Sequence, residues 1–300
     1  MEMNTINKEV VISPIFYMGN KKKLISKGLT DLFPKDIDVF YDLFSGSGVV
    51  SINSNANKYI INDINKYLYD LYNLFKTNDS EGIINHIENR IDEFGLARER
   101  TKRNEYLDKK KIEEYKLAYS NFRNLYNENK NVFDFYTLMF YSFSQQFRFG
   151  KNGKFNMPCG NDCFSEKNKD YIVNGCNFFS KPSVNIYSHS YEYILEKYPP
   201  HVNDFVYLDP PYLNTTATYN ENNGWSKEDE LKLYSVCEDL NKNNIRFAMS
   251  NVFENKGIIN TNLIEWCEKN NFKVYDFKNF SYTACGKGNS NAKEVLITNY

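Results

Sequence analysis

The sequence predicts an α/β fold in which a parallel sheet is interrupted by an inserted, mainly helical domain that carries a β-hairpin. Residues 14–76 and 183–300 alternate short buried strands with helical stretches, whereas 77–182 are polar and mostly helical in pattern up to residue 141. In the first segment a strand, a glycine turn, a helix and a second strand fit within about thirty residues, which predicts a β–α–β unit with parallel strands. We therefore expect one domain from 1–76 together with 183–300, and a second from 77–182.

The strands follow from short β-rich runs. Asp38–Phe44 ends at the glycine turn Ser45-Gly-Ser-Gly48, and Lys58–Asn62 is typical of a second buried strand. Phe205–Leu208 stops at Asp209-Pro210-Pro211-Tyr212, because consecutive prolines cannot continue a central strand. The pattern then predicts a helix, a strand, a helix and a closing strand at 226–243, Ile245–Met249, 259–270 and Glu294–Thr298.

The composition excludes several classes of protein. A net charge of −1, from 37 basic and 38 acidic residues, excludes a histone-like binder, and 41% apolar with 25% charged residues excludes wholesale disorder. The sequence shows neither a secretory signal nor a run of 18 apolar residues, so we expect no membrane span. Six scattered cysteines without a C-x-x-C pair and only three histidines argue against a zinc site and favour the reducing cytoplasm.

The middle segment is locally basic. The segment from Leu96 to Lys111 contains seven basic and three acidic residues, which gives it a local charge of +4 in a chain whose net charge is −1. A solvated helix face and a phosphate-binding patch are both consistent with this pattern. Residues 143–160 are typical of a hairpin with aromatic arms around Gly150-Lys-Asn-Gly153.

The first candidate site is the turn Asp42-Leu-Phe-Ser-Gly-Ser-Gly48. Glycines at the carboxyl end of a strand let the backbone approach a ligand in the crevice where open α/β sheets bind. Asp63 follows Asp42 by 21 residues, and a carboxylate there accepts hydrogen bonds from both hydroxyls of a ribose. A dinucleotide and S-adenosylmethionine both fit this spacing, and Ser51 in place of the third glycine favours S-adenosylmethionine.

The second candidate site is Asp209-Pro210-Pro211-Tyr212. The prolines fix the main chain, so the Asp209 carboxylate and a main-chain carbonyl oxygen lie side by side. This pair matches the two hydrogens of an exocyclic amino group, and accepting both hydrogen bonds concentrates electron density on a nitrogen that is otherwise a poor nucleophile. Tyr212 offers a flat face on which a base can stack. A plain turn after a strand is the alternative for the tetrapeptide by itself.

With these motifs in this order, the chain resembles the Dam-like DNA adenine methyltransferases of bacteria and phages over nearly its whole length. Tyr17–Lys21 is similar to the family's amino-terminal motif, Asn62–Asn65 to its ribose-binding turn and Phe143–Pro158 to its recognition hairpin; Ser250-Asn251 and Glu294–Tyr300 also fit. The resemblance implies a Rossmann-like class I S-adenosylmethionine-dependent methyltransferase sheet with an inserted target-recognition domain. It implies cofactor contacts by Tyr17, Lys21, Asp42, Phe44, Gly46, Gly48, Asp63, Ile64 and Asp209.

The resemblance implies transfer of a methyl group from S-adenosylmethionine to the exocyclic amino nitrogen of adenine in duplex DNA. Asp209, Pro210 and Tyr212 would be the catalytic residues, and positioning would be their main task. The adenine must be flipped out of the stack to be reached. No metal is expected, because the sulfonium already supplies the electrophile. Duplex DNA is the expected partner, and a cognate restriction endonuclease acting separately stays open.

The resemblance also assigns DNA contacts to the hairpin. A guanidinium can bond to a guanine edge with two parallel hydrogen bonds, which suits Arg148. Basic residues of the hairpin and of 98–111 would neutralise phosphates, while Phe143 and Ser144 would lie beside the flipped adenine and Pro158 against a thymine methyl. The expected DNA-binding residues are Phe143, Ser144, Gln146, Arg148, Lys151, Lys154, Asn156 and Pro158.

GATC is the recognition sequence we expect, although two departures bear on the outer bases. Gln146 stands where family members that read GATC carry a bulky apolar wedge, and Asn161-Asp162 stand where a basic residue is usual.

Three rival hypotheses remain. Pro158-Cys159 suggests a cytosine C5 methyltransferase, but the glutamate of an E-N-V context is missing. The others are a methyltransferase for RNA or protein, and a catalytically silent DNA-binding module.

Overall fold

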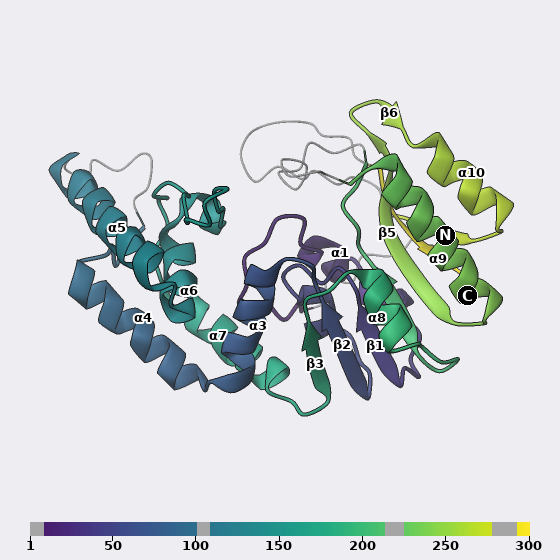
Figure 1. Cartoon of the computed structure of the whole chain (residues 1–300), viewed down its shortest axis with the longest axis horizontal. Coiled ribbons are helices and arrows are strands. Elements are labelled where there is room, and N and C mark those ends of the chain that lie inside the picture. The colour runs from purple at the N-terminus through teal and green to yellow at the C-terminus, as the bar shows by residue number, and fades with distance from the viewer. Residues whose placement is uncertain (1–8, 101–108, 214–224, 278–292) are drawn as a thin grey trace. The chain divides into compact units, whose positions relative to one another are not determined.

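The computed structural model describes residues 9–100, 109–213, 225–277 and 293–300 of the chain (Figure 1). The chain divides into two compact units. The sheet unit consists of residues 1–10, 21–65 and 183–300, and the helical unit of residues 11–20 and 66–182. The helical unit thus begins one helix earlier than the boundary expected between residues 76 and 77. The functional division of the chain into domains stays a prediction.

The strands of the sheet unit are β1 Val39–Asp42, β2 Lys58–Asn62, β3 Val184–Tyr187, β4 Phe205–Leu208, β5 Arg246–Asn255, β6 Ile258–Ile259, β7 Lys273–Asp276 and β8 Lys293–Thr298. They form one sheet in the order β3-β2-β1-β4-β5-β8-β7, and β6 pairs with β5. The pairs from β3 across to β5 are parallel, whereas β8 is antiparallel to both β5 and β7. The predicted α/β architecture with a mostly parallel sheet is confirmed.

Side chains of the strands alternate between two faces of this sheet. On one face Tyr41, Val206 and Phe247 belong to an apolar cluster shared with three helices. On the other face the ring of Phe33 packs on those of Phe40 and Phe205, with centroids 5.9 and 4.9 Å apart. The first face is covered by α8 Tyr191–Lys197, α9 Lys227–Lys242 and α10 Thr261–Lys269, and the shorter helices of this unit are α1 Lys22–Ser26, η1 Leu29–Leu32 and α2 Val49–Ile52.

The strand order reverses beside β1. The chain runs from β1 to β2 and β3 on one side, and β4 pairs with the opposite edge of β1. Asp42, the last residue of β1, is in register with Tyr207 of β4. The loops that leave these two neighbouring strands therefore start at a topological switch point, where open α/β sheets form their ligand crevice.

The helical unit is built around a buried helix. Its elements are α3 Lys66–Thr77, α4 Ser80–Phe94, α5 Lys109–Asn129, α6 Val132–Tyr141, η2 Phe143–Gln145 and α7 Glu166–Phe179. Every residue from Asp134 to Tyr141 is buried, because α6 is apolar on nearly all sides and contacts α3, α4 and α5. The ring of Phe75 on α3 packs edge-on against Tyr136 of α6 at 5.1 Å.

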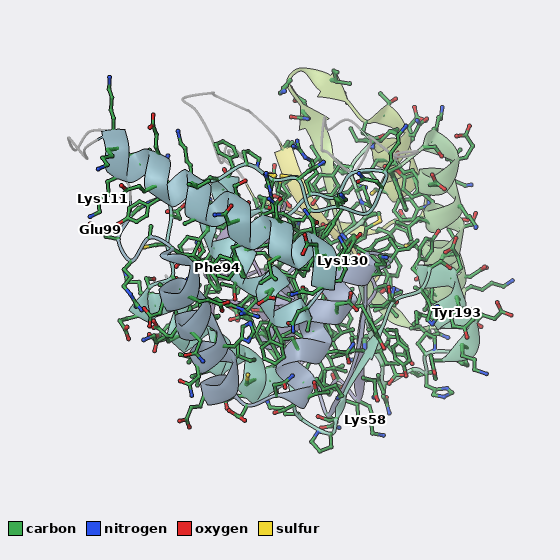
Figure 2. The ribbon with its side chains drawn as sticks, turned by 60° about the vertical axis from the view of Figure 1, so that its left-hand side comes forward. Lys58, Phe94, Glu99, Lys111, Lys130 and Tyr193 are labelled. Atoms are coloured by element: carbon green, nitrogen blue, oxygen red, sulfur yellow. The ribbon has the colours of Figure 1, made fainter. Side chains whose placement is uncertain are left out.

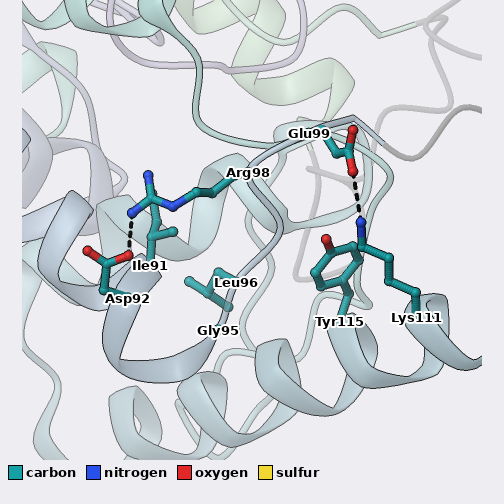
Figure 3. A pocket seen from close by; sticks show the side chains of 8 residues that line it. All are labelled: Ile91, Asp92, Gly95, Leu96, Arg98, Glu99, Lys111 and Tyr115. Carbon is teal, nitrogen blue, oxygen red and sulfur yellow. Dashed lines mark hydrogen bonds and ion pairs between the residues drawn. The ribbon is translucent and has the colours of Figure 1, made fainter.

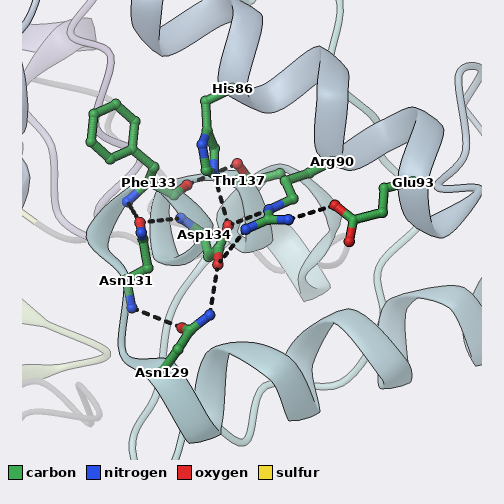
Figure 4. Close-up of polar contacts among 8 residues, drawn as sticks. All are labelled: His86, Arg90, Glu93, Asn129, Asn131, Phe133, Asp134 and Thr137. Carbon is green, nitrogen blue, oxygen red and sulfur yellow. Dashed lines mark hydrogen bonds and ion pairs between the residues drawn. The ribbon is translucent and has the colours of Figure 1, made fainter.

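A polar cluster surrounds the one carboxylate on this buried helix (Figure 4). Asp134 is fully buried, and its Oδ1 lies 2.7 Å from His86 Nε2 and 2.8 Å from Arg90 Nε, both on α4. Asn129 Nδ2, at the end of α5, donates to Oδ2 at 3.2 Å. Burial alone would raise the pKa of Asp134, but these donors outweigh it and lower that pKa. The cluster therefore ties α4 and α5 to α6 through an ionised carboxylate.

Candidate active site

The predicted glycine turn leaves β1 and enters α2. Gly46 and Gly48 have φ angles of 53° and 73°, a left-handed conformation that side-chain-bearing residues rarely adopt. The turn is closed by a hydrogen bond from Gly48 N to Ser45 O at 2.7 Å, and Ser45 N donates to Asn62 O of β2 at 3.0 Å. The backbone of this turn is thus held against the carboxyl ends of β1 and β2.

Asp42 is a buried carboxylate at the root of that turn. Its side chain is 1% exposed, Oδ2 accepts a hydrogen bond from Ser51 Oγ at 2.6 Å, and Oδ1 is buried without a hydrogen-bond partner among the described residues. Burial, with smaller contributions from Asp209 and Asp63, raises the pKa of Asp42 to about 7. Ser51, which the sequence marks only as a departure from a dinucleotide motif, is the donor that holds Asp42.

Asp63 lies in the turn after β2 and binds the glycine turn. Its Oδ2 accepts from Gly46 N and its Oδ1 from Asn65 N, both at 2.9 Å. Burial raises its pKa to about 6. Each carboxylate oxygen keeps further lone-pair capacity for a pair of hydroxyls. The neighbouring side chain of Ile64 is 75% exposed.

The side chain of Asn62 joins the ends of three strands. Its Nδ2 donates to Leu43 O, after β1, at 3.1 Å and to His189 O, after β3, at 3.0 Å. Its Oδ1 accepts from His189 N at 3.0 Å. Asn62 is 1% exposed, so the amide acts as an internal clamp on the loops around the site.

Asp209 directly follows β4 and makes an ion pair with Lys21. Lys21 Nζ lies 2.7 Å from Asp209 Oδ2, and its side chain is 3% exposed. Burial alone would lower the pKa of Lys21, but the carboxylates of Asp209 and Glu294 outweigh burial and raise it. Burial raises the pKa of Asp209, and Lys21 opposes that shift. The two predicted residues, far apart in the chain, therefore form one charged centre.

Tyr212 and Glu294 complete this centre. The Tyr212 hydroxyl lies 3.0 Å from Asp209 Oδ1 and 3.0 Å from Glu294 Oε1. Lys21 Nζ lies 3.5 Å from the same Glu294 oxygen and 5.2 Å from the centroid of the Tyr212 ring. The sequence marks Glu294 only as part of the segment Glu294–Tyr300, which is similar to the family, and does not predict its contacts with Lys21 and Tyr212. The available signal was a charged residue at the start of the apolar strand Val295–Thr298.

Aromatic side chains line the glycine turn. The ring of Phe44 lies 5.2 Å from that of Tyr191 and 5.8 Å from that of Trp225. The buried polar atoms Tyr191 OH and Trp225 Nε1 have no hydrogen-bond partner in the described chain. Tyr17, expected near Lys21, belongs to the helical unit, where its ring stacks on Phe147 at 5.5 Å.

The predicted hairpin is present as a narrow turn with two isolated bridges, Ser142 to Cys159 and Phe149 to Phe155. Helix α5 holds its second arm, since Asn127 exchanges two hydrogen bonds with Phe155 at 2.8 and 3.0 Å. Lys130, which follows α5 (Figure 2), donates to Gly153 O at 2.8 Å.

The expected DNA-binding side chains of the hairpin are mostly at its surface. Phe143 is 45% exposed, and Arg148, Lys151, Lys154, Asn156 and Pro158 are exposed. Arg148 Nε donates to Asn156 Oδ1 across the hairpin at 2.8 Å. Ser144 has a left-handed φ of 55°, and Gln146 Nε2 donates to its carbonyl at 3.4 Å.

Part of the basic cluster at 98–111 is paired with acids. Arg98 binds Asp92 and Glu88, and Lys111 Nζ lies 2.9 Å from Glu99 Oε1. Four of these side chains line an open pocket of about 500 Å³ beside α4 and α5, namely Asp92, Arg98, Glu99 and Lys111 (Figure 3). Their charges are partly neutralised within the protein, which weakens the interpretation of these two residues as phosphate ligands. Lys102 and Arg103 lie outside the described residues.

Comparison with known proteins identifies the family. A family model for D12 class N6 adenine-specific DNA methyltransferases matches residues 17–282. The chain belongs to this family. The expected resemblance to Dam-like enzymes and the Rossmann-like class I methyltransferase fold are thereby confirmed. Glu294 lies beyond the matched range.

Curated relatives of this D12 chain include DNA-modifying enzymes. It is 40% identical over 300 residues to Type II methyltransferase M.FokI of Planomicrobium okeanokoites, and 37% identical over 305 residues to Modification methylase StsI of Streptococcus sanguinis. These alignments cover 96% and 98% of the chain but 43% of each relative, so the chain spans less than half of their length. DNA adenine methylase of Escherichia coli is 26% identical over 217 residues, 69% of both chains.

Two further properties of this D12 chain concern metals and membranes. Within its described residues, no group of three or more His, Cys, Asp or Glu side chains could hold a metal ion. The expectation that no metal takes part stays a prediction. The helices of the described ranges include none that is both long and apolar enough to span a bilayer.

Proposed function

We propose that this chain transfers a methyl group from S-adenosylmethionine to the exocyclic amino nitrogen of adenine in duplex DNA. The observation that carries the proposal is the position of Asp209, which follows β4 at the switch point of the sheet and lies 2.7 Å from Lys21 Nζ and 3.0 Å from the Tyr212 hydroxyl. Membership of the D12 family supports adenine as the base and DNA as the substrate.

The side chains of the sheet unit fit the proposed cofactor. Asp42 Oδ1 is a buried acceptor without a partner in the described chain, which suits the ammonium of a methionine group. Lys21 suits its carboxylate, and Asp63, already oriented by Gly46 N and Asn65 N, suits the ribose hydroxyls. When bound, S-adenosylmethionine would supply an electrophilic methyl carbon whose bond to sulfur breaks as the adenine nitrogen attacks, leaving S-adenosylhomocysteine.

The residues of the Asp209–Tyr212 turn would orient the adenine. Asp209 would accept a hydrogen bond from the amino group, and the main chain fixed by Pro210 would accept the second. Tyr212 would stack on the extruded base and offset part of the cost of flipping it, roughly a few kcal/mol. The nitrogen would lose one proton as it gains the methyl group, and we propose that Asp209 accepts that proton.

The helical unit would bind and read the DNA. Its exposed hairpin presents Arg148, Lys151 and Lys154, and Asn127 of α5 and Lys130, just after α5, bind the main chain of the hairpin. We propose GATC as the recognition sequence, with Arg148 reading a guanine edge. The names of two relatives, a type II methyltransferase and a modification methylase, support a role in modification beside a separate endonuclease. A DNA substrate would place this activity in the cytoplasm.

The test measures methyl transfer directly. The chain is incubated with radiolabelled S-adenosylmethionine and unmethylated duplex DNA, and modified bases are mapped by sequencing that detects N6-methyladenine. The proposal predicts label in adenine at one short sequence and none in a duplex whose target purine lacks the amino group. Asp209→Ala should abolish transfer while the protein stays folded by circular dichroism. Duplex binding without any methyl uptake by the wild-type chain would instead support a silent DNA-binding module.

A further inference from the structure

We propose that Glu294 is a positioning residue that draws the Tyr212 hydroxyl away from Asp209, so that Asp209 Oδ1 can accept a hydrogen of the substrate amine. This inference rests on the proposed adenine methylation. It adds a role for a residue of the last strand, outside the range matched by the family model.

The first step concerns the state of Asp209. Both of its carboxylate oxygens are engaged inside the protein, Oδ2 by Lys21 Nζ at 2.7 Å and Oδ1 by the Tyr212 hydroxyl at 3.0 Å. A substrate amine that is to donate to Oδ1 must compete with the tyrosine hydroxyl. The reaction therefore needs a way to turn that hydroxyl elsewhere without leaving its proton unsatisfied in a buried site.

The second step concerns the hydroxyl itself. A tyrosine hydroxyl has one hydrogen to donate. Two carboxylate oxygens lie at the same 3.0 Å from the Tyr212 hydroxyl, one on Asp209 and one on Glu294. The hydroxyl can therefore change acceptor by rotating about its C–O bond, and the ring that is to stack on the base need not move.

The third step concerns the position of Glu294. Strand register places Glu294 opposite Val252, on the same face of the sheet as Asp42 and Tyr207. Its side chain is fully buried, and β8 is paired on both sides, by β5 and β7. Glu294 is thus a fixed acceptor on the rigid sheet, whereas Asp209 and Tyr212 lie in the turn that follows β4.

The fourth step concerns charge. A buried carboxylate is a strong acceptor only if it stays ionised, which requires a neighbouring cation. Lys21 Nζ lies 3.5 Å from Glu294 Oε1 and has three hydrogens, so it can serve both carboxylates at once. One lysine therefore pairs with both acids, and the same Glu294 oxygen also lies within hydrogen-bond distance of the Tyr212 hydroxyl.

The test compares single-turnover methyl transfer by the wild-type chain and by Glu294→Leu, which removes the acceptor at similar volume. We expect Glu294→Leu to slow transfer by about 10- to 100-fold, the effect of removing a hydrogen bond to a charged group, with little change in KM for DNA. Glu294→Gln, which keeps a weaker acceptor, should lie between the two. Glu230→Gln is the matched control, because Glu230 is similarly buried on α9 and binds Asn260 instead.

A second background separates this role from a structural one. Tyr212→Phe removes the competing hydroxyl, so Glu294→Leu should slow the Tyr212→Phe chain far less than it slows the wild type. Equal slowing in both backgrounds would overturn the inference, as would a wild-type rate in Glu294→Leu. Lack of any methyl transfer by the wild-type chain would overturn the proposed function itself, and this inference with it.

Discussion

Asp42→Asn tests whether ionisation of the buried carboxylate before the glycine turn lowers the free energy of unfolding. Asparagine keeps the size of the side chain and an oxygen for Ser51 Oγ, but it cannot ionise. Burial raises the pKa of Asp42 from 3.8 to about 7, so the folded protein holds this proton more tightly than the unfolded chain does. The stability associated with the protonated side chain is therefore complete below about pH 4 and is lost as the pH rises to about 7.

The size of the effect follows from the width of that window. One pKa unit corresponds to about 1.4 kcal/mol, so the free energy of unfolding of the wild type should fall relative to Asp42→Asn by about 3 kcal/mol between about pH 5 and about pH 8. Urea unfolding followed by tryptophan fluorescence measures it, because Trp225 and Trp266 both belong to the sheet unit.

Asp36→Asn is the control for this prediction. Asp36 is exposed, and its hydrogen bond to Arg246 lowers its pKa, so both the folded and the unfolded state are ionised across this pH range. The difference between Asp36→Asn and the wild type should therefore not change with pH. If the difference between Asp42→Asn and the wild type were equally flat, the assignment of a raised pKa to Asp42 would be refuted.

The remaining predictions concern the helical unit. Replacing Lys151 and Lys154 by glutamine should reduce the slope of log Kd against log salt concentration by about one for each lysine that neutralises a phosphate, measured by fluorescence anisotropy; an unchanged slope would remove their phosphate role. Cys159→Ser should keep nearly full methyl transfer, and a decrease of a thousandfold or more, roughly 4 kcal/mol, would revive covalent catalysis by this cysteine. Asp134→Ala leaves Arg90 and His86 without their buried partner, so it should lower the free energy of unfolding by about 3–5 kcal/mol. Urea titrations followed by circular dichroism measure this change. A decrease below about 1 kcal/mol would contradict the stabilising role of Asp134.

The sequence predicted the parts of the fold and site that have local signals. The turn at Gly46 and Gly48 needs positive φ angles, and the prolines after Asp209 mark the end of a strand, so both loops are visible in the residue order. Strands β3 and β7 were missed, because Asn185 of β3 is exposed and β7 is partly or fully exposed along its length, which gives no apolar run.

The long-range parts of the site could not be predicted from residue order. Asp209 and Glu294 meet because β4 and β8 flank β5, and Lys21 contacts both from the start of α1. Strand order depends on the whole sheet, so the residues next to each of these side chains in the sequence do not indicate which partner it will meet. The sequence showed Ser51 only as a residue that replaces the third glycine of a dinucleotide motif. Its hydrogen bond to Asp42 depends on the orientation of α2, which residue order does not reveal.

The amide of Asn62 has a consequence for protein engineering. One side chain sets the spacing between the loop after β1 and the loop after β3. A graft of either loop from a related enzyme inherits that spacing, whatever sequence it brings. Libraries that vary these loops should therefore keep position 62 constant and vary residues that face outward, such as Ile64.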